Sequence, residues 1–351
     1  MNNNVLQDTD VLISVIMPVY NVKDFIQDSI CSILNQTVTN FELIIIDDCS
    51  NDGTAEIIES ILNFDDRISI FHNSKNMGLV YSLNYGLMKA RGRYIARMDG
   101  DDISHPRRFE NQIAYFERNT DVILCGTWTR NFGKNNYEWH VKDNRKELKY
   151  RMMFHPVLAH PSFMFRRELF ENNGLLYNFD FFLAEDYAFA VESLRFGNIG
   201  VLQKERLRYR VHDKQISYQN YAKQKNIMMN VRKKLIEQMD LNMSIDDLKV
   251  LGHIGSDEKI DTFDQLFNLY NKVVLIINKN ASSCTLKKVF LDEFALYAIH
   301  NRKLIYIVRL LLSDICFYEK ICLIKNGMAS IKNKINRHLF LYLRVIAWNR
   351  W

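Results

Sequence analysis

Residues 94–102 have the sequence YIARMDGDD, an apolar segment of strand length that runs directly into three carboxylates. A strand fixes the direction of its side chains, and a turn at its carboxyl end presents them in a crevice at the edge of a sheet. Carboxylates two positions apart in such a turn can converge on one hard cation, Mg²⁺ or Mn²⁺. Because Asp and Gly also form ordinary turns, the surrounding elements decide between a metal site and a plain acidic turn.

Short apolar runs alternate with helical patterns before this segment. Four runs predict strands, at 12–17, 41–46, 68–71 and 94–98. Three segments have helical periodicity, at 24–34, 54–62 and 78–89, and Asp24 is predicted to cap the first. This alternation predicts an α/β fold with a mostly parallel sheet and with ligands at the carboxyl ends of its strands.

After residue 107 the pattern is mixed. It predicts further strands at 123–128, 163–166 and 207–211 and a helix at 187–195. From about residue 217 apolar residues recur only at helical spacing, which predicts a helical C-terminal region.

The composition is that of a folded protein of one large domain or two modest ones. The chain has 351 residues, of which 48% are hydrophobic and 25% charged, and only four are prolines. Its six cysteines include no CxxC pair, the first ten residues are polar, and no uncharged apolar stretch reaches about 18 residues. We therefore expect reduced thiols, no signal peptide, no transmembrane helix and a cytoplasmic location.

The net charge of +5 is unevenly distributed. Residues 316–351 carry seven Lys or Arg and one Glu, so the rest of the chain has a net charge of −1. This basic tail also contains Phe340, Tyr342, Trp348 and Trp351. It suits peripheral contact with an anionic membrane surface, while a helix docked on the protein itself is the equal alternative. No interleaved basic and aromatic motif points to nucleic acid.

Polar residues follow the other predicted strands. Asp47 and Asp48 end a buried strand, where a carboxylate can accept a hydrogen bond from a base N–H or a ribose hydroxyl; the alternative is helix capping. Asn76 and Gly78 open the third helix, and Gly78 would let the backbone approach a ligand, although Asn-x-Gly is also an ordinary helix start.

Two later groups have the residue types of a reaction site. Glu185 and Asp186 follow an aromatic run, so the pKa of at least one of these carboxyls should be raised, which suits a general base. Alternatively, the pair stabilises a helix N-terminus. Both can hold if one residue caps the helix while the other catalyses. Arg210 and His212 point to the same side of a strand end and can hold a pyrophosphate and a metal. His160, in a loop with His155, either shapes an acceptor site or packs a turn.

Several common enzyme classes lack their motifs here. The sequence has no phosphate-binding Gly-x-x-x-x-Gly-Lys loop, no Gly-x-Ser-x-Gly elbow and no clustered Cys/His zinc site. A non-catalytic nucleotide-sugar-binding or lectin-like protein and a nucleotidyltransferase are the alternatives to a transferase. The nucleotidyltransferase would need a Gly-rich loop where this chain has Pro18-Val19-Tyr20-Asn21.

Taken together, these motifs resemble those of glycosyltransferase family 2, the inverting transferases with the GT-A fold. The resemblance covers about residues 10–218 and rests on the segments 15–21, 32–37, 46–54, 76–79, 94–106, 185–186 and 209–212. More narrowly, the segments 94–103, 184–187 and 209–217 resemble bacterial lipooligosaccharide β-1,3-N-acetylglucosaminyl and N-acetylgalactosaminyl transferases. Cys49 stands where the family usually has Gly, and the loop 160–162 differs from the Asn-rich loop of the narrower group.

The resemblance implies a domain organisation. A GT-A domain would span 10–218, with a nucleotide-sugar-binding half (10–107) and an acceptor and catalytic half (108–218), followed by a helical region with the basic tail (219–351). It also implies transfer of a hexose or N-acetylhexosamine from a UDP-sugar to an oligosaccharide or glycolipid acceptor in lipooligosaccharide, O-antigen or capsule synthesis. A UDP-glucose- or UDP-galactose-specific transferase is the alternative, and the location would be the cytoplasmic face of the inner membrane.

The resemblance finally implies a role for each site residue. Asp186, with Glu185, would be the catalytic base, and His160 would contact the acceptor. The Mn²⁺ or Mg²⁺ ligands would be Asp101, Asp99, Asp102 and His212. The nucleotide-sugar would bind to Pro18, Tyr20, Asn21, Asp47, Asp48, Asn76, Gly78, Arg97, Asp99, Gly100, Arg210 and His212.

Overall fold

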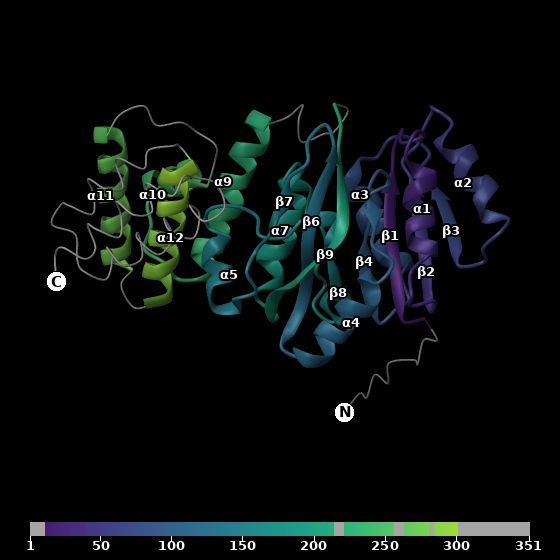
Figure 1. The fold of residues 1–351 in the computed structure, drawn as a ribbon, viewed down its shortest axis with the longest axis horizontal. Coiled ribbons are helices and arrows are strands. Elements are labelled where there is room, and N and C mark those ends of the chain that lie inside the picture. The colour runs from purple at the N-terminus through teal and green to yellow at the C-terminus, as the bar shows by residue number, and fades with distance from the viewer. Residues whose placement is uncertain (1–10, 214–220, 256–262, 281–283, 301–351) are drawn as a thin grey trace, which may run out of the picture. The chain divides into compact units, whose positions relative to one another are not determined.

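The computed structural model describes residues 11–213, 221–255, 263–280 and 284–300 (Figure 1). Contacts divide the chain into two compact units, the first of residues 1–149 and 156–235 and the second of residues 150–155 and 236–351. The predicted boundary at 218–219 and the basic tail both lie outside the described residues.

A nine-stranded sheet forms the centre of the first unit, in the order β3-β2-β1-β4-β8-β6-β9-β5, with β7 paired to β6 (Figure 1). The strands are β1 (Ile13–Val19), β2 (Phe41–Asp47), β3 (Ile68–His72), β4 (Tyr94–Arg97), β5 (Ile103–Ser104), β6 (Val122–Gly133), β7 (Glu138–Trp139), β8 (Met164–Arg166) and β9 (Asn198–Val211). The first four are mutually parallel, as predicted, and β8 runs antiparallel to both β4 and β6.

Helices cover both faces of the parallel part of the sheet. Alternate residues of β1, such as Val15 and Met17, belong to a core that also contains Ile30 of α1 (Ile26–Leu34). Ile16 points to the other face, where a Cβ at Gly86 of α3 (Leu79–Lys89) would lie 2.5 Å from its Cγ2. Because both faces are buried, β1 and β2 are apolar almost throughout, which is why the sequence predicted them.

The other helices of the first unit are shorter or follow the mixed pattern. They are α2 (Thr54–Leu62), α4 (Arg108–Arg118), α5 (Arg145–Arg151, which ends in the second unit), α6 (Glu168–Glu171) and α7 (Glu185–Ser193), with 3₁₀ turns at His160–Ser162 and Phe179–Phe181. The prediction that Asp24 caps the first helix is wrong. The cap position is Phe25, without a side-chain hydrogen bond, because the amides of Phe25 and Ile26 donate to Val22 O instead.

The mixed half contains longer strands than the apolar runs indicated. β6 and β9 pair in parallel as far as Gly133 and Val211, with register shifts between Val122 and Thr129. Their outer halves carry charged residues such as Arg130 and Glu205, which bond to each other at 2.8 Å. Hydropathy alone therefore identified only the buried parts of these two strands.

The described residues of the second unit are helical, as predicted. Its helices are α10 (Ile245–Ile254), α11 (Phe263–Lys279) and α12 (Cys284–His300), while α9 (Tyr221–Gln238) begins in the first unit. Within this unit Arg151 forms ion pairs with Asp292 and Glu293. Among the described residues, no helix is both long enough and apolar enough to span a membrane.

Candidate functional site

The carboxylates of Asp99, Asp101 and Asp102 converge in the turn after β4. One carboxylate oxygen of each lies within 4.8 Å of those of the others. Burial, followed by the charges of Asp101 and Asp99, raises the pKa of Asp102 well above its usual value. Its Oδ2 is buried and has no hydrogen-bond partner among the described residues. Clustered carboxylate oxygens with one unpaired acceptor fit a divalent cation such as Mg²⁺ or Mn²⁺, which would relieve their repulsion.

The end of β9 holds this turn through three bonds. Arg210 donates its backbone N–H to Asp102 Oδ1 and its Nε–H to Asp101 O, both at 2.7 Å. His212 Nε2 lies 2.8 Å from Asp101 Oδ2. The Arg210 guanidinium lies over the rings of Phe25 and Phe132, at 4.6 and 4.5 Å. The structure thus brings together the residues that were predicted from two segments more than a hundred positions apart.

Arg97 lies beneath the turn with 3% of its surface exposed. It forms an ion pair with Asp99, and its Nε and Nη1 have no hydrogen-bond partner among the described residues. Burial raises the pKa of Asp99, Asp102 and Asp186, and the charge of Arg97 opposes this rise in all three. A single buried guanidinium therefore acts on both groups of predicted reaction-site carboxylates.

The carboxylate of Asp48 holds the loop that precedes α3. It accepts hydrogen bonds from Asn73 Nδ2 (2.7 Å), Met77 N (2.7 Å) and Gly78 N (2.8 Å). Gly78 has φ +87°, which favours glycine, and no atom lies within 4 Å of where its Cβ would be. Asn76 is exposed in this loop. These bonds fix the backbone beside the predicted nucleotide position, and direct nucleotide contact by Asp48 stays a prediction.

Asp47 and the end of β1 complete this edge of the sheet. Asp47 accepts from Ser50 N at 3.2 Å and lies 3.1 Å from His72 Nδ1. Asn21 Oδ1 accepts from Asn51 N at 2.9 Å, and the neighbouring Tyr20 has 47% of its surface exposed. An exposed aromatic ring at the carboxyl end of a buried parallel strand suits stacking on a flat ligand.

Two further predicted residues give shape to the site. Pro18, which has no N–H, lies beyond the last pair between β1 and β4, Ile16 with Arg97. Gly100 lies within the acidic turn after β4, where a Cβ would be 2.8 Å from Val19 Cγ1. Any larger residue at position 100 would therefore displace the turn or β1.

The two carboxylates at the start of α7 have different surroundings. Glu185 is buried, with 7% exposed, and its Oε2 accepts the N–H of Leu183 at 2.8 Å. Burial and then the charge of Asp186 raise the pKa of Glu185 to about 7. Asp186 is less buried, its Oδ1 accepts from Tyr187 N at 2.7 Å, and burial raises its pKa as well. Glu185 thus holds the loop before α7 through a backbone hydrogen bond, and the catalytic role of Asp186 stays a prediction.

His160 packs inside the first unit. Its Nε2 lies 3.0 Å from Tyr177 Oη, and its ring lies 5.1 Å from that of Phe163. Burial, followed by the charge of Arg97, lowers its pKa well below the usual value, so the imidazole is neutral. His155 belongs to the second unit, where its Nε2 lies 3.2 Å from Glu293 Oε2. Any contact of His160 with an acceptor stays a prediction.

Arg108 and Tyr177 were missed by the sequence analysis. Arg108 is fully buried, and its Nη2 donates to Arg97 O (2.8 Å) and Phe163 O (3.0 Å) beneath the site. Burial lowers its pKa to about 9. Tyr177 is fixed by two hydrogen bonds with Asn84, at 2.8 and 2.9 Å. The only sequence signal for Arg108 was its i,i+4 spacing to Gln112 on an amphipathic helix. Two surface residues of such a helix would have the same spacing, so the signal did not identify a buried pair.

Comparison with known proteins places this site in a family. A model of Glycosyl transferase family 2 matches residues 14–174. An uncharacterized glycosyltransferase of Haemophilus influenzae is 31% identical over 255 residues, which cover 70% of this chain and 79% of that protein. The chain belongs to glycosyltransferase family 2. This family 2 member is also 34% identical to the O-antigen biosynthesis glycosyltransferase WbnJ of Escherichia coli, over 58% of the chain and 81% of that protein. Its match to the uncharacterized glycosyltransferase EpsJ of Bacillus subtilis, at 34% identity, covers 52% of the chain and 56% of EpsJ.

Solved structures agree with this family 2 glycosyltransferase in fold. S. aureus TarS 1-349, in complex with UDP-GlcNAc, has a TM-score of 0.55 at 17% identity, with 90% of this chain and 89% of that chain covered. The mannosyltransferase PcManGT of Pyrobaculum calidifontis, in complex with GDP-Man and Mn²⁺, has a TM-score of 0.53 at 16% identity and covers 93% and 89%. The predicted GT-A fold and the family are therefore confirmed.

Proposed function

We propose that this family 2 glycosyltransferase moves a hexose or N-acetylhexosamine from a UDP-sugar to a saccharide acceptor in surface glycan synthesis, with inversion at the anomeric carbon and through a β-1,3 bond. One observation carries the proposal: the acidic turn after β4 and the acidic start of α7 lie in one compact unit and share the charge of Arg97. The relative that acts in O-antigen biosynthesis supports the glycan, and the neighbour solved with UDP-GlcNAc supports the donor class.

In this proposal the turn after β4 holds the diphosphate of the donor. Asp101, Asp99 and Asp102, with His212, would hold Mn²⁺ or Mg²⁺, and the mannosyltransferase neighbour solved with Mn²⁺ supports that choice. Such a cation neutralises the charge that develops on a departing nucleoside diphosphate. Arg210, already fixed between two aromatic rings, adds a permanent positive charge on the same side.

The uridine would lie along the edge formed by Tyr20, Asp47 and Asp48. Tyr20 offers a ring for stacking, and Asp48 fixes the loop before α3 through the N–H groups of Met77 and Gly78. Asp99, fixed by Arg97, would accept a hydrogen bond from the ribose.

Asp186 would remove the proton of the attacking acceptor hydroxyl. Its raised pKa brings a carboxylate closer to the proton affinity that a base needs near neutral pH. Attack from the face opposite the diphosphate forms the new bond to the anomeric carbon as the bond to UDP breaks, and the configuration inverts without a covalent intermediate.

A donor screen tests this proposal. The full chain is incubated with UDP-GlcNAc, UDP-GalNAc, UDP-glucose, UDP-galactose and GDP-mannose, each with Mn²⁺ or Mg²⁺ and a mixture of oligosaccharide acceptors. We expect UDP release with one or two UDP-sugars and a β-linked product, identified by the anomeric NMR coupling. A product that retains the α configuration of the donor would contradict the single displacement. Donor binding without any release would favour the non-catalytic alternative.

We also propose that the basic tail, residues 316–351, contacts the anionic cytoplasmic face of a membrane. Seven Lys or Arg and six aromatic residues support this, since each cation near an anionic surface contributes roughly 1 kcal/mol. Removal of residues 316–351 should shift the protein from vesicles of phosphatidylglycerol to the supernatant in a sedimentation assay. Equal sedimentation of the truncated and full chains would indicate that the tail docks on the protein.

A further inference from the structure

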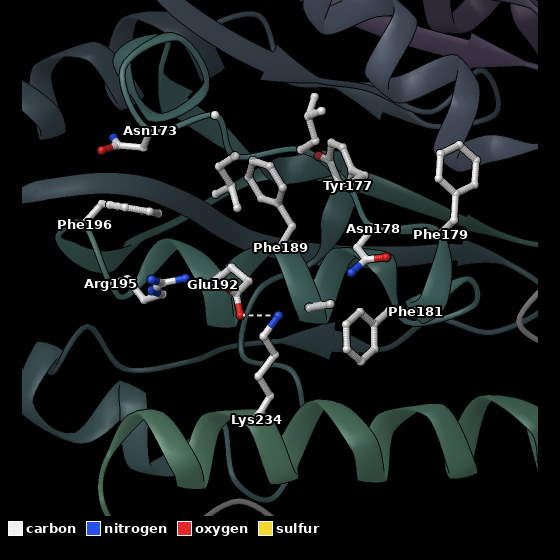
Figure 2. A pocket seen from close by; sticks show the side chains of 14 residues that line it. Asn173, Tyr177, Asn178, Phe179, Phe181, Phe189, Glu192, Arg195, Phe196 and Lys234 are labelled. Carbon is white, nitrogen blue, oxygen red and sulfur yellow. Dashed lines mark hydrogen bonds and ion pairs between the residues drawn. The ribbon is translucent and has the colours of Figure 1, made fainter.

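A pocket of about 410 Å³ opens in the first unit, beside α7 (Figure 2). It lies between the segment 173–181, the outer turns of α7 and Lys234 of α9. Its volume is in the usual range for pockets that bind small molecules, roughly 300–1,000 Å³. Its lining shares no residue with the predicted donor, metal and base residues, so it is a separate feature of the described chain.

The pocket has an aromatic floor and an exposed aromatic rim. Tyr177 and Phe189 are buried and stack with their ring centroids 4.4 Å apart. Phe179 and Phe196 stand at the edge, with 58% and 37% of their surfaces exposed. Figure 2 shows Tyr177 and Phe189 in the middle of the lining, with Phe196 and Phe179 at its opposite ends. Several exposed aromatic side chains around one concave surface mark a ligand site more often than a plain surface.

The opposite wall is polar and already paired. Glu192 accepts from Lys234 Nζ at 2.7 Å and from Arg195 Nη1 at 3.3 Å (Figure 2). Asn178 uses its Oδ1 to accept from Asp180 N at 2.8 Å, which leaves its amide N–H groups to donate to a ligand. The pocket therefore offers hydrogen-bond donors and acceptors on one side and ring faces on the other.

This combination selects a class of ligand. A sugar ring has an apolar C–H face and a rim of hydroxyl groups that both donate and accept. A lipid chain would bury the Glu192 and Lys234 charges without solvating them, which is costly.

The pocket is joined to the reaction site through two elements. α7 carries Asp186 at its start and Glu192 on its far side, which is on the order of 9 Å along the helix axis. Tyr177 forms the pocket floor with one face of its ring, while its hydroxyl lies 3.0 Å from His160 Nε2. A chain of sugars that presents its terminal hydroxyl to Asp186 is long enough to place a later unit in the pocket.

We propose that this pocket binds a saccharide unit of the acceptor that is remote from the hydroxyl being glycosylated. The proposal rests on the proposed transferase function and adds to it a site that makes acceptor binding depend on the length of the acceptor. The unit stacks on the exposed rings of the rim, Phe179 and Phe196, above the buried aromatic floor, and its hydroxyl groups bond to Glu192, Lys234 and Asn178.

The test compares variants of the pocket on defined saccharides. The probe is an array of immobilised oligosaccharides of two to six units, both neutral and uronate-bearing, together with soluble members of the same set as acceptors. The variants are Phe179→Ala, Glu192→Gln and Lys234→Met, each checked for an unchanged melting temperature. Phe64→Ala is the matched control, because Phe64 is 88% exposed and does not line the pocket.

We expect Phe179→Ala and Lys234→Met to weaken binding of the longer oligosaccharides and to raise their KM roughly tenfold. The KM of the shortest accepted saccharide and the slow hydrolysis of the UDP-sugar should change less than twofold, as they should throughout for Phe64→Ala. A merely structural role for these residues would affect the donor and short acceptors equally.

Two outcomes would contradict the pocket assignment and leave the proposed function unaffected. In the first, all three variants bind the longer oligosaccharides as tightly as the wild type does. The other is a wild-type chain that hydrolyses a UDP-sugar but binds no oligosaccharide on the array. Loss of UDP release from every donor, with variant-sensitive oligosaccharide binding, would instead contradict the transferase function and support the saccharide site.

Discussion

The acidic turn after β4 and the acidic start of α7 are both carboxylate clusters, but their surroundings differ. The turn has the guanidinium of Arg97 below it and the imidazole of His212 beside it, and yet one Asp102 oxygen has no hydrogen-bond partner among the described residues. At the start of α7 the carboxylates accept backbone N–H groups, from Leu183 and Tyr187 among the described residues. Arg97 acts on both clusters, but the convergence of three carboxylates in the turn suits a bound cation, whereas the buried pair at the start of α7 has raised pKa values that suit proton exchange.

We infer that this difference suits the two clusters to two tasks. In the turn, burial and the neighbouring carboxylates raise the pKa of Asp102 well above its usual value, so a bound cation would be needed to keep the cluster ionised as ligands. Carboxylates that are buried beside one another have raised pKa values, as for Glu185 at about 7, and can exchange a proton near neutral pH. The four changes below separate these tasks, in order of decreasing effect.

Asp186→Asn should have the largest effect. Asn retains an oxygen for Tyr187 N–H but cannot accept a proton, so transfer should fall roughly 10³- to 10⁴-fold. Affinity for the UDP-sugar, measured by calorimetry with Mn²⁺ present, should stay within twofold. Asp180→Asn, an exposed change in the preceding turn, is the control. Joint loss of donor binding and transfer would mean that Asp186 is structural.

Asp101→Ala should abolish the metal dependence rather than the proton transfer. Without this carboxylate the turn loses its contact with His212, and we expect turnover to fall roughly 10³-fold and to stop responding to Mn²⁺. Calorimetric titration of UDP with and without Mn²⁺ measures the change, and Asp66→Ala, at an exposed carboxylate, serves as the control. A normal Mn²⁺ response in the variant would remove Asp101 from the ligand set.

The sequence predicted the positions in these two clusters better than the contacts between them. Strand ends at 47 and 98 were visible because β1, β2 and β4 are buried on both faces and therefore apolar. The convergence of Asp101 with His212 followed from the rule that ligands gather at the carboxyl ends of strands. The length of β9, which carries His212 to that edge, was underestimated because its middle is polar.

The buried cations were beyond sequence reasoning. Arg97 occupies a strand position flanked by apolar residues, and nothing local indicates that its partner is Asp99 or that it influences Asp186. Arg108 begins a helix beside Arg107 and resembles a surface residue, yet it bonds to two buried carbonyl groups. The contact of His160 with Tyr177 depends on the packing of two loops. Such contacts are set by tertiary packing, which residue periodicity does not encode.

Arg97→Met tests whether the turn depends on its internal cation. The change leaves Asp99 and Asp102 without their buried counter-charge, and breaking such a pair should lower the free energy of unfolding by about 3 kcal/mol. Mn²⁺ should restore more of the melting temperature in this variant than in the wild type, because it can replace the missing charge. Thermal unfolding with EDTA or Mn²⁺ measures this, with Arg118→Met on the exposed face of α4 as the control. Equal Mn²⁺ effects in variant and wild type would separate Arg97 from the metal turn.

Glu185→Gln tests the other cluster through its pH dependence. The folded pKa of Glu185, about 7, lies above its usual 4.5, so the protonated carboxyl favours the folded state. That contribution is fully present below about pH 4.5 and is lost as the pH rises through 7. Gln imitates the protonated form and keeps an oxygen for Leu183 N–H, so the variant should match the wild type at low pH. Above pH 8 it should be more stable, by on the order of 3 kcal/mol.

Urea unfolding at intervals from pH 5 to pH 8.5 measures the difference, with Glu56→Gln on the exposed side of α2 as the control. A difference that does not change with pH would mean that Glu185 is ionised throughout, and the two clusters would then hold their charge by the same means.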